Sequence, residues 1–281
     1  MAVTRVVIGS CGRRDYSFLL PLTAMLWKKL IGLDPFLMLV GDWEEKERNR
    51  TALSALRYLE IEHVMIGTMP EYPEATLAQN CREHAAVYPF PEDTWLMCSD
   101  ADLWPIRKEW YYKHETSSKS LALYYSNGDH YSTFPTCHMT AQAKTWRQIM
   151  GYKEGDELVP TIKKNLDTWL QTYQAKYPKW DRNFAIWMSD QAMASDRIRE
   201  WPGFPHDVAQ YERVGHPPVD RIDRCQWPAG ALDVRDKVDA HIIRPADVQE
   251  AWPRVRELFS KLLPKWAQWA EDYRNRYVAG Y

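Results

Sequence analysis

Short apolar runs and longer amphipathic stretches alternate along the first part of the chain. Four runs are predicted to be buried strands: residues 4–12, 35–42, 61–67 and 94–100. Three stretches between them repeat apolar side chains at helical spacing and are predicted helices: residues 15–32, 44–59 and 73–88. Because strand and helix alternate, we predict an α/β fold with a Rossmann-like, mainly parallel sheet flanked by helices.

The pattern changes beyond residue 105. We expect further strands at 119–126, 130–139 and 239–245, and helices at 140–151, 158–174 and 181–201. The chain then ends in a Trp-rich helical appendage at 248–277. Trp266, Trp269 and Tyr273 lie at helical spacing in it, and we expect them to pack on the rest of the chain rather than to form a membrane-facing or dimer surface.

Composition excludes several classes of protein. The formal net charge is −2, so no basic field favours nucleic acid or an anionic membrane. No apolar run approaches the roughly 18 residues that span a bilayer. The five cysteines include no Cys-x-x-Cys pair, which is typical of a reducing compartment. We therefore expect a soluble cytoplasmic protein, whose 14 Trp and 16 Tyr suit core packing and the stacking of sugars or bases.

Polar residues follow the predicted strands. In open α/β sheets, ligands bind beyond the carboxyl ends of the strands. These ends carry the following side chains: Ser10, Cys11, Arg13, Arg14, Asp42, Asp100 and Asp102. The first turn, "GSCGRR", has neither the G-x-G-x-x-G nor the Walker pattern, so a nicotinamide enzyme or a P-loop ATPase is disfavoured.

Asp100 and Asp102 are the strongest candidates for chemistry. Side chains at i and i+2 of an extended segment point the same way, so the two carboxylates converge at the end of a buried strand. Two hard oxygen ligands suit Mg²⁺ or Mn²⁺. The alternative is that one aspartate caps the next turn and the other is solvated.

The stretch at 78–106, "AQNCREHAAVYPFPEDTWLMCSDADLWPI", resembles the central part of nucleotide-sugar-dependent glycosyltransferases of the GT-A fold. The opening at 15–42 resembles part of their first strand-helix-strand unit. The resemblance is clear over about residues 5–106, weaker to 245, and absent in the tail. It implies a GT-A-like catalytic domain at 1–245, with a nucleotide-sugar half at 1–106 and an acceptor half at 107–245, and a helical tail at 246–281 packed on it.

The same resemblance implies roles for individual residues. Asp100 would lie near the ribose and the metal, and Asp102 would coordinate Mn²⁺ or Mg²⁺ at the diphosphate of the donor, most simply a UDP-sugar. A histidine from a late segment would be the third ligand. His241 in "DAHIIRP" has the expected place in the chain. Three other histidines stay open as alternatives: His138, His206 and His216.

Further donor contacts are expected from the strand ends and the preceding helix. Developing charge on a leaving diphosphate is stabilised by cations, and Arg13, Arg14 and Arg82 are placed to help. Tyr16 suits stacking on the base. The remaining candidate contacts to the donor are Ser10, Cys11 and Asp42.

Asp190, in "MSDQAM", is the candidate catalytic carboxylate. The resemblance implies an acid on a late helix that faces the acceptor, where it takes the hydroxyl proton or supports the reacting sugar. Asp181 and Asp196 are the alternative candidates for this acid. The alternative without a catalytic role is that Asp190 caps a helix or is a solvated helix residue. The stereochemistry of transfer stays open.

The expected function is metal-dependent transfer of a sugar to a hydroxyl acceptor, most simply a glycan. A nucleotidyltransferase on a related sheet and a non-catalytic carbohydrate-binding relative are the alternatives. A haloacid-dehalogenase-like phosphatase is disfavoured, because its aspartate pair follows the first strand and not the fourth. A hydroxymethylated DNA base remains an alternative acceptor.

Overall fold

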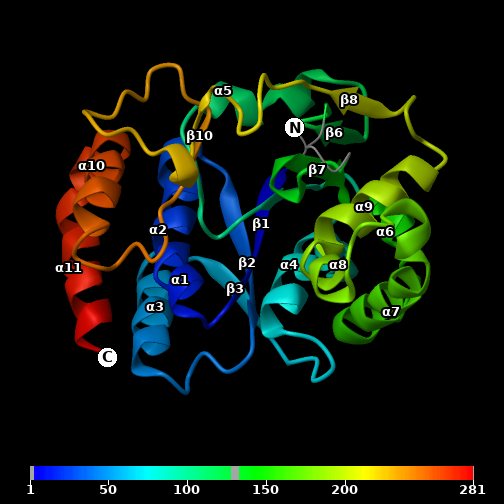
Figure 1. Cartoon of the computed structure of the whole chain (residues 1–281), viewed down its shortest axis with the longest axis horizontal. Helices are drawn as coiled ribbons and strands as arrows, with labels where there is room; N and C mark the ends of the chain where they lie inside the picture. Colours follow the sequence, from blue (N-terminus) through cyan, green and yellow to red (C-terminus); the bar gives the residue numbers. More distant parts are fainter. Residues whose placement is uncertain (1–2, 128–132, 281) are drawn as a thin grey trace.

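A seven-stranded sheet forms the centre of the molecule in the computed structural model, which describes residues 3–127 and 133–280 (Figure 1). In spatial order the strands are β3 (Glu62–Ile66), β2 (Asp34–Val40), β1 (Thr4–Cys11), β4 (Trp95–Ser99), β7 (Met139–Gln142), β6 (Leu121–Leu123) and β8 (Val208–Gln210). Within these strands β7 alone runs antiparallel to its neighbours. The mainly parallel, helix-flanked sheet predicted from the sequence is thus confirmed.

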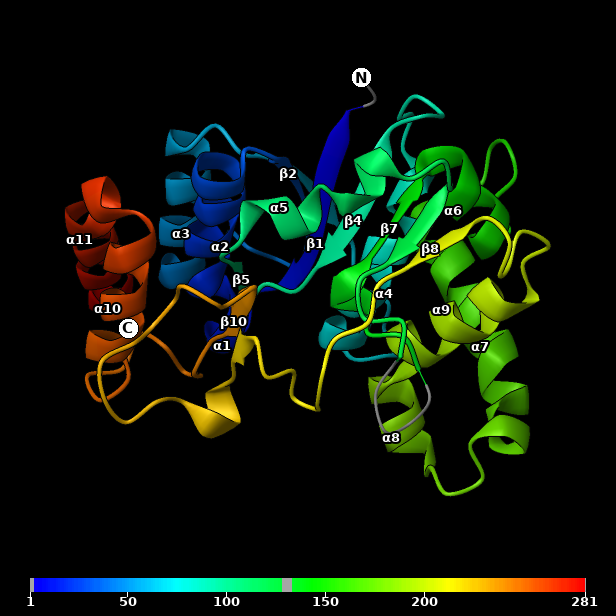
Figure 2. The ribbon, with the colours of Figure 1, turned by 90° about the horizontal axis from the view of Figure 1, so that it is seen from above.

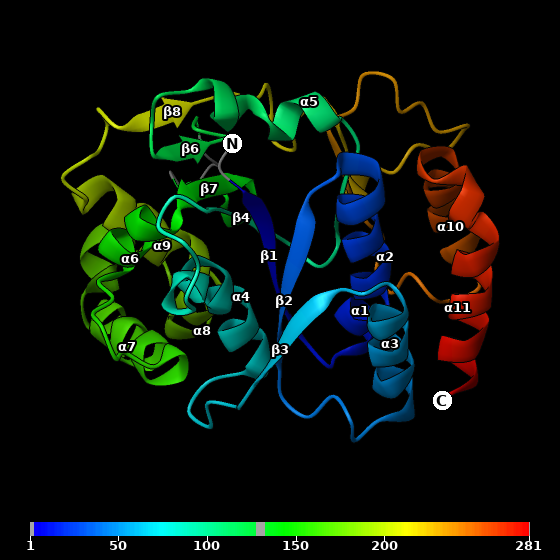
Figure 3. The same ribbon diagram turned by 180° about the vertical axis from the view of Figure 1, so that it is seen from behind.

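Helices cover both faces of the sheet, as the view from behind shows (Figure 3). One face carries α1 (Arg14–Ser17), α2 (Leu19–Leu26) and α3 (Glu47–Tyr58). The other carries α4 (Glu74–His84), α6 (Ala143–Met150), α7 (Leu158–Lys176), α8 (Arg182–Trp187) and α9 (Ser189–Glu200). The short helix α5 (Lys108–Tyr111) follows strand β5 (Leu103–Pro105). Since side chains alternate along a strand, Val6 and Ile8 of β1 enter one core and Val7 the other.

Gly9 allows α4 to lie unusually close to β1. A Cβ atom at this position would be 1.8 Å from the carbonyl oxygen of Ala78. Any other residue would therefore push the helix away from the strand. The close approach matters for the site, because Arg82 lies one turn further along α4.

The C-terminal tail is built into the core of the molecule. Helices α10 (Trp252–Leu262) and α11 (Ala267–Ala279) form an outer layer against α3 and α2 (Figure 2). Tyr273 and Tyr277 are fully buried, and both rings contact Phe18. The hydroxyl of Tyr277 also lies 2.6 Å from that of Ser17. Among the described residues no helix combines the length and apolarity needed to cross a membrane.

Two sequence expectations near the site were wrong in detail. Residues 130–132 of the strand expected at 130–139 lie outside the described residues, and Thr136–His138 form a short 3-10 helix. The residues that follow pair as β7 with β4, so the expected helix at 140–151 begins only at Ala143. Pairing with the open edge of β4 satisfies backbone groups that a helix at these residues would leave unbonded.

The helix expected at 181–201 is two helices. It breaks at Met188, between α8 and α9. The side chain of Asp181 accepts a hydrogen bond from the backbone N–H of Phe184 and so caps the first of them. The break turns the first residues of α9 toward the carboxyl edge of the sheet, where Asp190 lies.

We expect Tyr273→Ala to lower the free energy of unfolding by about 3–5 kcal/mol, because it removes a buried ring and the contacts of that ring with its neighbours. Tyr58→Ala is the matched control, since Tyr58 is 66% exposed and should cost less than about 1 kcal/mol. Urea denaturation of the two variants measures both values. Equal effects would show that the tail does not contribute to the core.

Candidate active site

A second, three-stranded sheet crosses the carboxyl edge of the large one. It has the order β5 (Leu103–Pro105), β10 (Asp239–His241) and β9 (Arg221–Ile222). β10 runs antiparallel to β5, and His241 pairs with Leu103. The backbone N–H of Ile242 donates to the carbonyl of Asp102 at 2.9 Å. This pairing brings a histidine from late in the chain next to the aspartate pair that follows β4.

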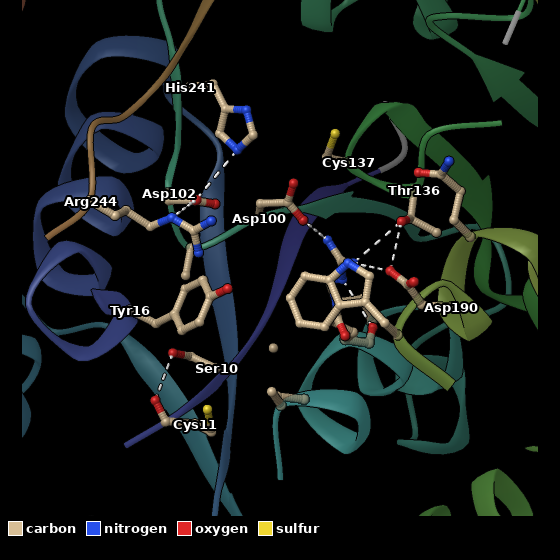
Figure 4. Close-up of a pocket in the computed structure, with 18 of the residues that line it drawn as sticks. Ser10, Cys11, Tyr16, Asp100, Asp102, Thr136, Cys137, Asp190, His241 and Arg244 are labelled. Carbon is tan, nitrogen blue, oxygen red and sulfur yellow. Dashed lines mark hydrogen bonds and ion pairs between the residues drawn. The ribbon is translucent and has the colours of Figure 1, made fainter. Parts of the chain in front are cut away.

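A cavity of about 230 Å³ opens at this edge. Its lining comes from the end of β1, from α4, from the segment after β4, from the start of α9 and from the small sheet. The polar and aromatic side chains in the lining are Ser10, Cys11, Tyr16, Gln79, Arg82, Asp100, Asp102, Thr136, Cys137, Trp187, Asp190, Gln191, Arg224, His241 and Arg244. Figure 4 shows Asp102, His241 and Arg244 on one side of the cavity and Thr136 and Asp190 on the other.

Asp100, Asp102 and His241 form a group suited to a metal ion. Each offers one ligand atom, and these atoms lie within 4.8 Å of one another. Two carboxylate oxygens and one imidazole nitrogen form a donor set that Mn²⁺ accepts and that suits Mg²⁺ through its oxygens. The residues therefore fit the divalent ion that the sequence resemblance implies.

Asp102 is the most buried member of this group. It is buried, and its Oδ2 atom lies 2.7 Å from Arg224, 3.1 Å from Arg244 and 3.4 Å from His241. Burial alone would raise the pKa of this carboxyl, but the three cationic neighbours hold it well below its usual range. Asp102 is thus an anion that can bind a cation at any physiological pH.

His241 is held between two carboxylates. Its Nε2 atom faces Asp102, and its Nδ1 atom lies 3.5 Å from Asp223. Burial would lower the pKa of the imidazole, but Asp102 and Asp223 together raise it above its usual value. The ring therefore carries a proton more readily in the metal-free protein than a solvated histidine does.

Arg82 links the two sides of the cavity. Its guanidinium is 3% exposed and pairs with Asp100 and, at 2.6 Å, with Asp190. A third bond of 3.3 Å reaches the hydroxyl of Thr136. Burial would lower the pKa of Arg82, but the neighbouring carboxylates raise it well above its usual value, so this buried cation is always charged.

Asp190 lies in the first turn of α9 and is 5% exposed. Burial raises the pKa of its carboxyl, while Arg82 acts in the opposite direction. Thr136 donates a hydrogen bond of 3.0 Å to the same oxygen that Arg82 contacts. These two partners hold the carboxylate at the cavity wall in one orientation.

Tyr16 lies on the side of the cavity formed by the end of β1. The guanidinium of Arg244 lies over its ring, 4.9 Å from the centroid. Ser10 and Cys11 complete this part of the lining. Burial raises the pKa of the Cys11 thiol, which is therefore a neutral lining group.

The structure does not bring every predicted donor contact into this cavity. Arg13 and Asp42 line a separate hollow. Arg13 is exposed and pairs loosely with Asp15 at 3.8 Å, and Asp42 accepts the backbone N–H groups of its own turn. Arg14 binds the buried Asp247 and so ties α1 to the segment before α10. Proximity to the end of a strand therefore predicts more donor contacts than the cavity contains, because the direction of each loop decides where its side chains point.

Alternative ligands and acids lie elsewhere. His206 and His216 do not line the cavity, and the side chain of His138 is outside the described part. Asp196 is buried on the far side of α9, where it accepts a hydrogen bond from the indole of Trp169. Asp181 caps α8, as described above.

Several residues of the cavity carried no sequence signal. Arg224 and Thr136 belong to no local pattern, and their positions depend on long-range pairing. Arg244, three residues after His241, and Gln191, next to Asp190, were recognisable only as neighbours of candidates. Trp187 is 42% exposed where it lines the cavity.

The chain resembles known proteins at the level of structure. No protein-family model and no curated protein matches the sequence. The solved structure of the galactosyltransferase LgtC in complex with donor and acceptor sugar analogs matches with a TM-score of 0.52 and 14% identity, over 92% of this chain and 94% of that one. An active-site variant of LgtC matches equally, over 93% and 95%. The chain therefore shares the GT-A-like fold of this solved structure.

The raised pKa of His241 predicts how stability depends on pH. A folded pKa above the unfolded value of about 6.5 contributes stability that is complete below that pH and is lost as pH rises through the folded pKa. In chelator, wild type should therefore exceed His241→Gln in free energy of unfolding most below pH 6.5. The difference should shrink at higher pH, by at most about 1.4 kcal/mol per unit. A difference independent of pH would contradict the assignment.

Proposed function

We propose that this protein is a metal-dependent glycosyltransferase that moves a sugar from a nucleoside-diphosphate sugar to a hydroxyl acceptor. The observation that carries the proposal is the convergence of Asp100, Asp102 and His241 at the carboxyl edge of the sheet. They lie in a cavity whose opposite wall holds a buried Arg–Asp pair. The fold shared with a galactosyltransferase supports the same class of reaction.

The donor diphosphate is assigned to the side of Asp102. Arg224 and Arg244 line the cavity there and offer guanidinium groups to phosphate oxygens. When bound, a Mn²⁺ or Mg²⁺ ion supplies positive charge to the leaving diphosphate. Asp102 would hold such an ion, and Arg224 and Arg244 would bind phosphate oxygens beside it.

The nucleoside is assigned to the pocket beside β1. Tyr16 offers a flat ring that can stack on a base, and Ser10 and Cys11 form the adjacent wall. The sequence resemblance to GT-A transferases favours a UDP-sugar as the donor.

Asp190 is assigned the catalytic role. Arg82 and Thr136 fix its carboxylate at the wall of the cavity, and burial raises its pKa toward the range of a proton acceptor. Such a group can take the proton of an attacking hydroxyl or hold the reacting sugar. The amide of Gln191 lies next to it in the cavity lining.

A glycan is the acceptor that the site supports best. Trp187 offers a half-exposed indole face at the rim, beside Asp190, and sugar rings stack on such faces. The net charge of −2 gives no support to duplex DNA carrying a hydroxymethylated base. The structure of LgtC with an acceptor sugar analog is in line with a sugar acceptor here.

Asp102→Asn should abolish metal-dependent use of the donor. We expect UDP-sugars, among a panel with GDP- and TDP-sugars, to raise the melting temperature of wild type with Mn²⁺ but not with EDTA. Donor hydrolysis should fall by on the order of 100-fold or more in the variant, because a charged ligand is lost from the metal site. Thermal shift and released UDP are the two measurements.

Asp233→Asn is the matched control, because this exposed carboxylate pairs with Arg235 and does not line the cavity. It should behave as wild type. Folded wild-type protein that responds to no sugar nucleotide would contradict the proposal. Release of pyrophosphate from a nucleoside triphosphate would favour a nucleotidyltransferase, and sugar binding without turnover a carbohydrate-binding relative.

A further inference from the structure

A carboxylate lies behind the candidate metal-binding histidine. The Oδ2 atom of Asp223 is 3.5 Å from Nδ1 of His241, on the side of the ring opposite Asp102. Asp223 is 8% exposed, and its other oxygen accepts the backbone N–H of Cys225 at 2.9 Å. The two oxygens thus have separate tasks: one caps the local turn and the other faces the imidazole.

The backbone register of the small sheet places Asp223 there. β9 pairs parallel with β10, so that Arg221 lies opposite Asp239 and Ile222 opposite Ala240. One residue further along both strands, Asp223 comes to lie beside His241. A shift of one residue would turn the side chains to the opposite face and separate the two groups.

A buried ionic network holds this register. Asp239 is fully buried and bonds Arg213 at 2.6 Å and Arg221 at 2.8 Å. Arg213 is itself fully buried and also pairs with Asp220 at 2.6 Å. Slippage of β10 would leave buried charges unpaired, which costs several kcal/mol. The network therefore fixes the strand that carries His241 against the strand that leads to Asp223.

We propose that Asp223 is a positioning residue that accepts the Nδ1–H of His241 and thereby directs Nε2 toward Asp100 and Asp102. This inference rests on the proposed function, because it gives His241 the role of metal ligand. Carboxylates that accept from the second nitrogen of a ligand histidine fix its tautomer and ring orientation. Their loss weakens metal binding by about 10- to 100-fold.

Asp223→Ser separates the two tasks of the side chain. A serine hydroxyl still accepts the backbone N–H of Cys225, so the turn keeps its cap, but it removes the carboxylate from His241. Calorimetry and electron paramagnetic resonance measure the binding of Mn²⁺ to donor-free protein. The Kd of Asp223→Ser for Mn²⁺ should be about 10- to 100-fold higher than that of wild type.

Asp233→Ser is the matched control. Asp233 likewise accepts the backbone N–H two residues ahead, from Arg235, but it is exposed and faces no histidine. Its Kd for Mn²⁺ should equal that of wild type. If Asp223→Ser also binds Mn²⁺ as wild type does, the positioning role is overturned while the proposed function stands. If wild type itself binds no Mn²⁺, the metal site of the proposed function fails first.

A double-mutant cycle distinguishes positioning from a general structural effect. In a His241→Ala background, Asp223→Ser should cause no further change in the Kd for Mn²⁺, because its effect acts through the imidazole. An equal loss in both backgrounds would overturn the proposal, since the effect would then not pass through His241.

Discussion

The buried guanidinium of Arg82 is the interaction on which the candidate site depends. A cation that is 3% exposed must be paired, and its partners are Asp100 from the segment after β4 and Asp190 from α9. Gly9 makes this possible, because it lets α4 pack close to β1 and brings Arg82 under the end of the sheet. The two carboxylates, 90 residues apart in the chain, are thereby held on facing walls of one cavity.

A second constraint closes the site from the other direction. The strand β10 lies between β5 and β9, and this order brings His241 between Asp102 and Asp223. Neither the two aspartates after β4 nor the histidine has the geometry of a metal site alone. The two sheets thus supply different parts of the site. The large sheet presents Asp100 and Asp102, and the small sheet adds the imidazole of His241 and two of the arginines that line the cavity.

Much of this could be predicted from the sequence, for reasons that are local. Strand and helix periodicity, and the position of the strand ends, identified the parallel sheet and the placing of Ser10, Cys11 and Asp100 at its edge. Order along the chain, together with a family resemblance, was enough to single out His241 and Asp190. Whether these residues perform the roles assigned to them stays a prediction for the experiments above.

The remainder depends on contacts between distant segments. Arg224 and Asp223 reach the site only through the pairing of β9 with β10, which no local pattern encodes. Arg13 and Asp42 follow strands as expected, yet their loops turn them into a neighbouring hollow. Residues 139–142 form a strand, because the edge of β4 offers backbone partners that a local helical pattern cannot reveal.

The most direct test of the account is a crystal structure of the protein with UDP and Mn²⁺, with anomalous scattering measured at the manganese edge. The account predicts one strong anomalous peak, bound by Asp100, Asp102 and Nε2 of His241 and in contact with the diphosphate, with the uracil beside Tyr16. Manganese bound elsewhere, or UDP held in the cavity with these three side chains turned away from any ion, would contradict it.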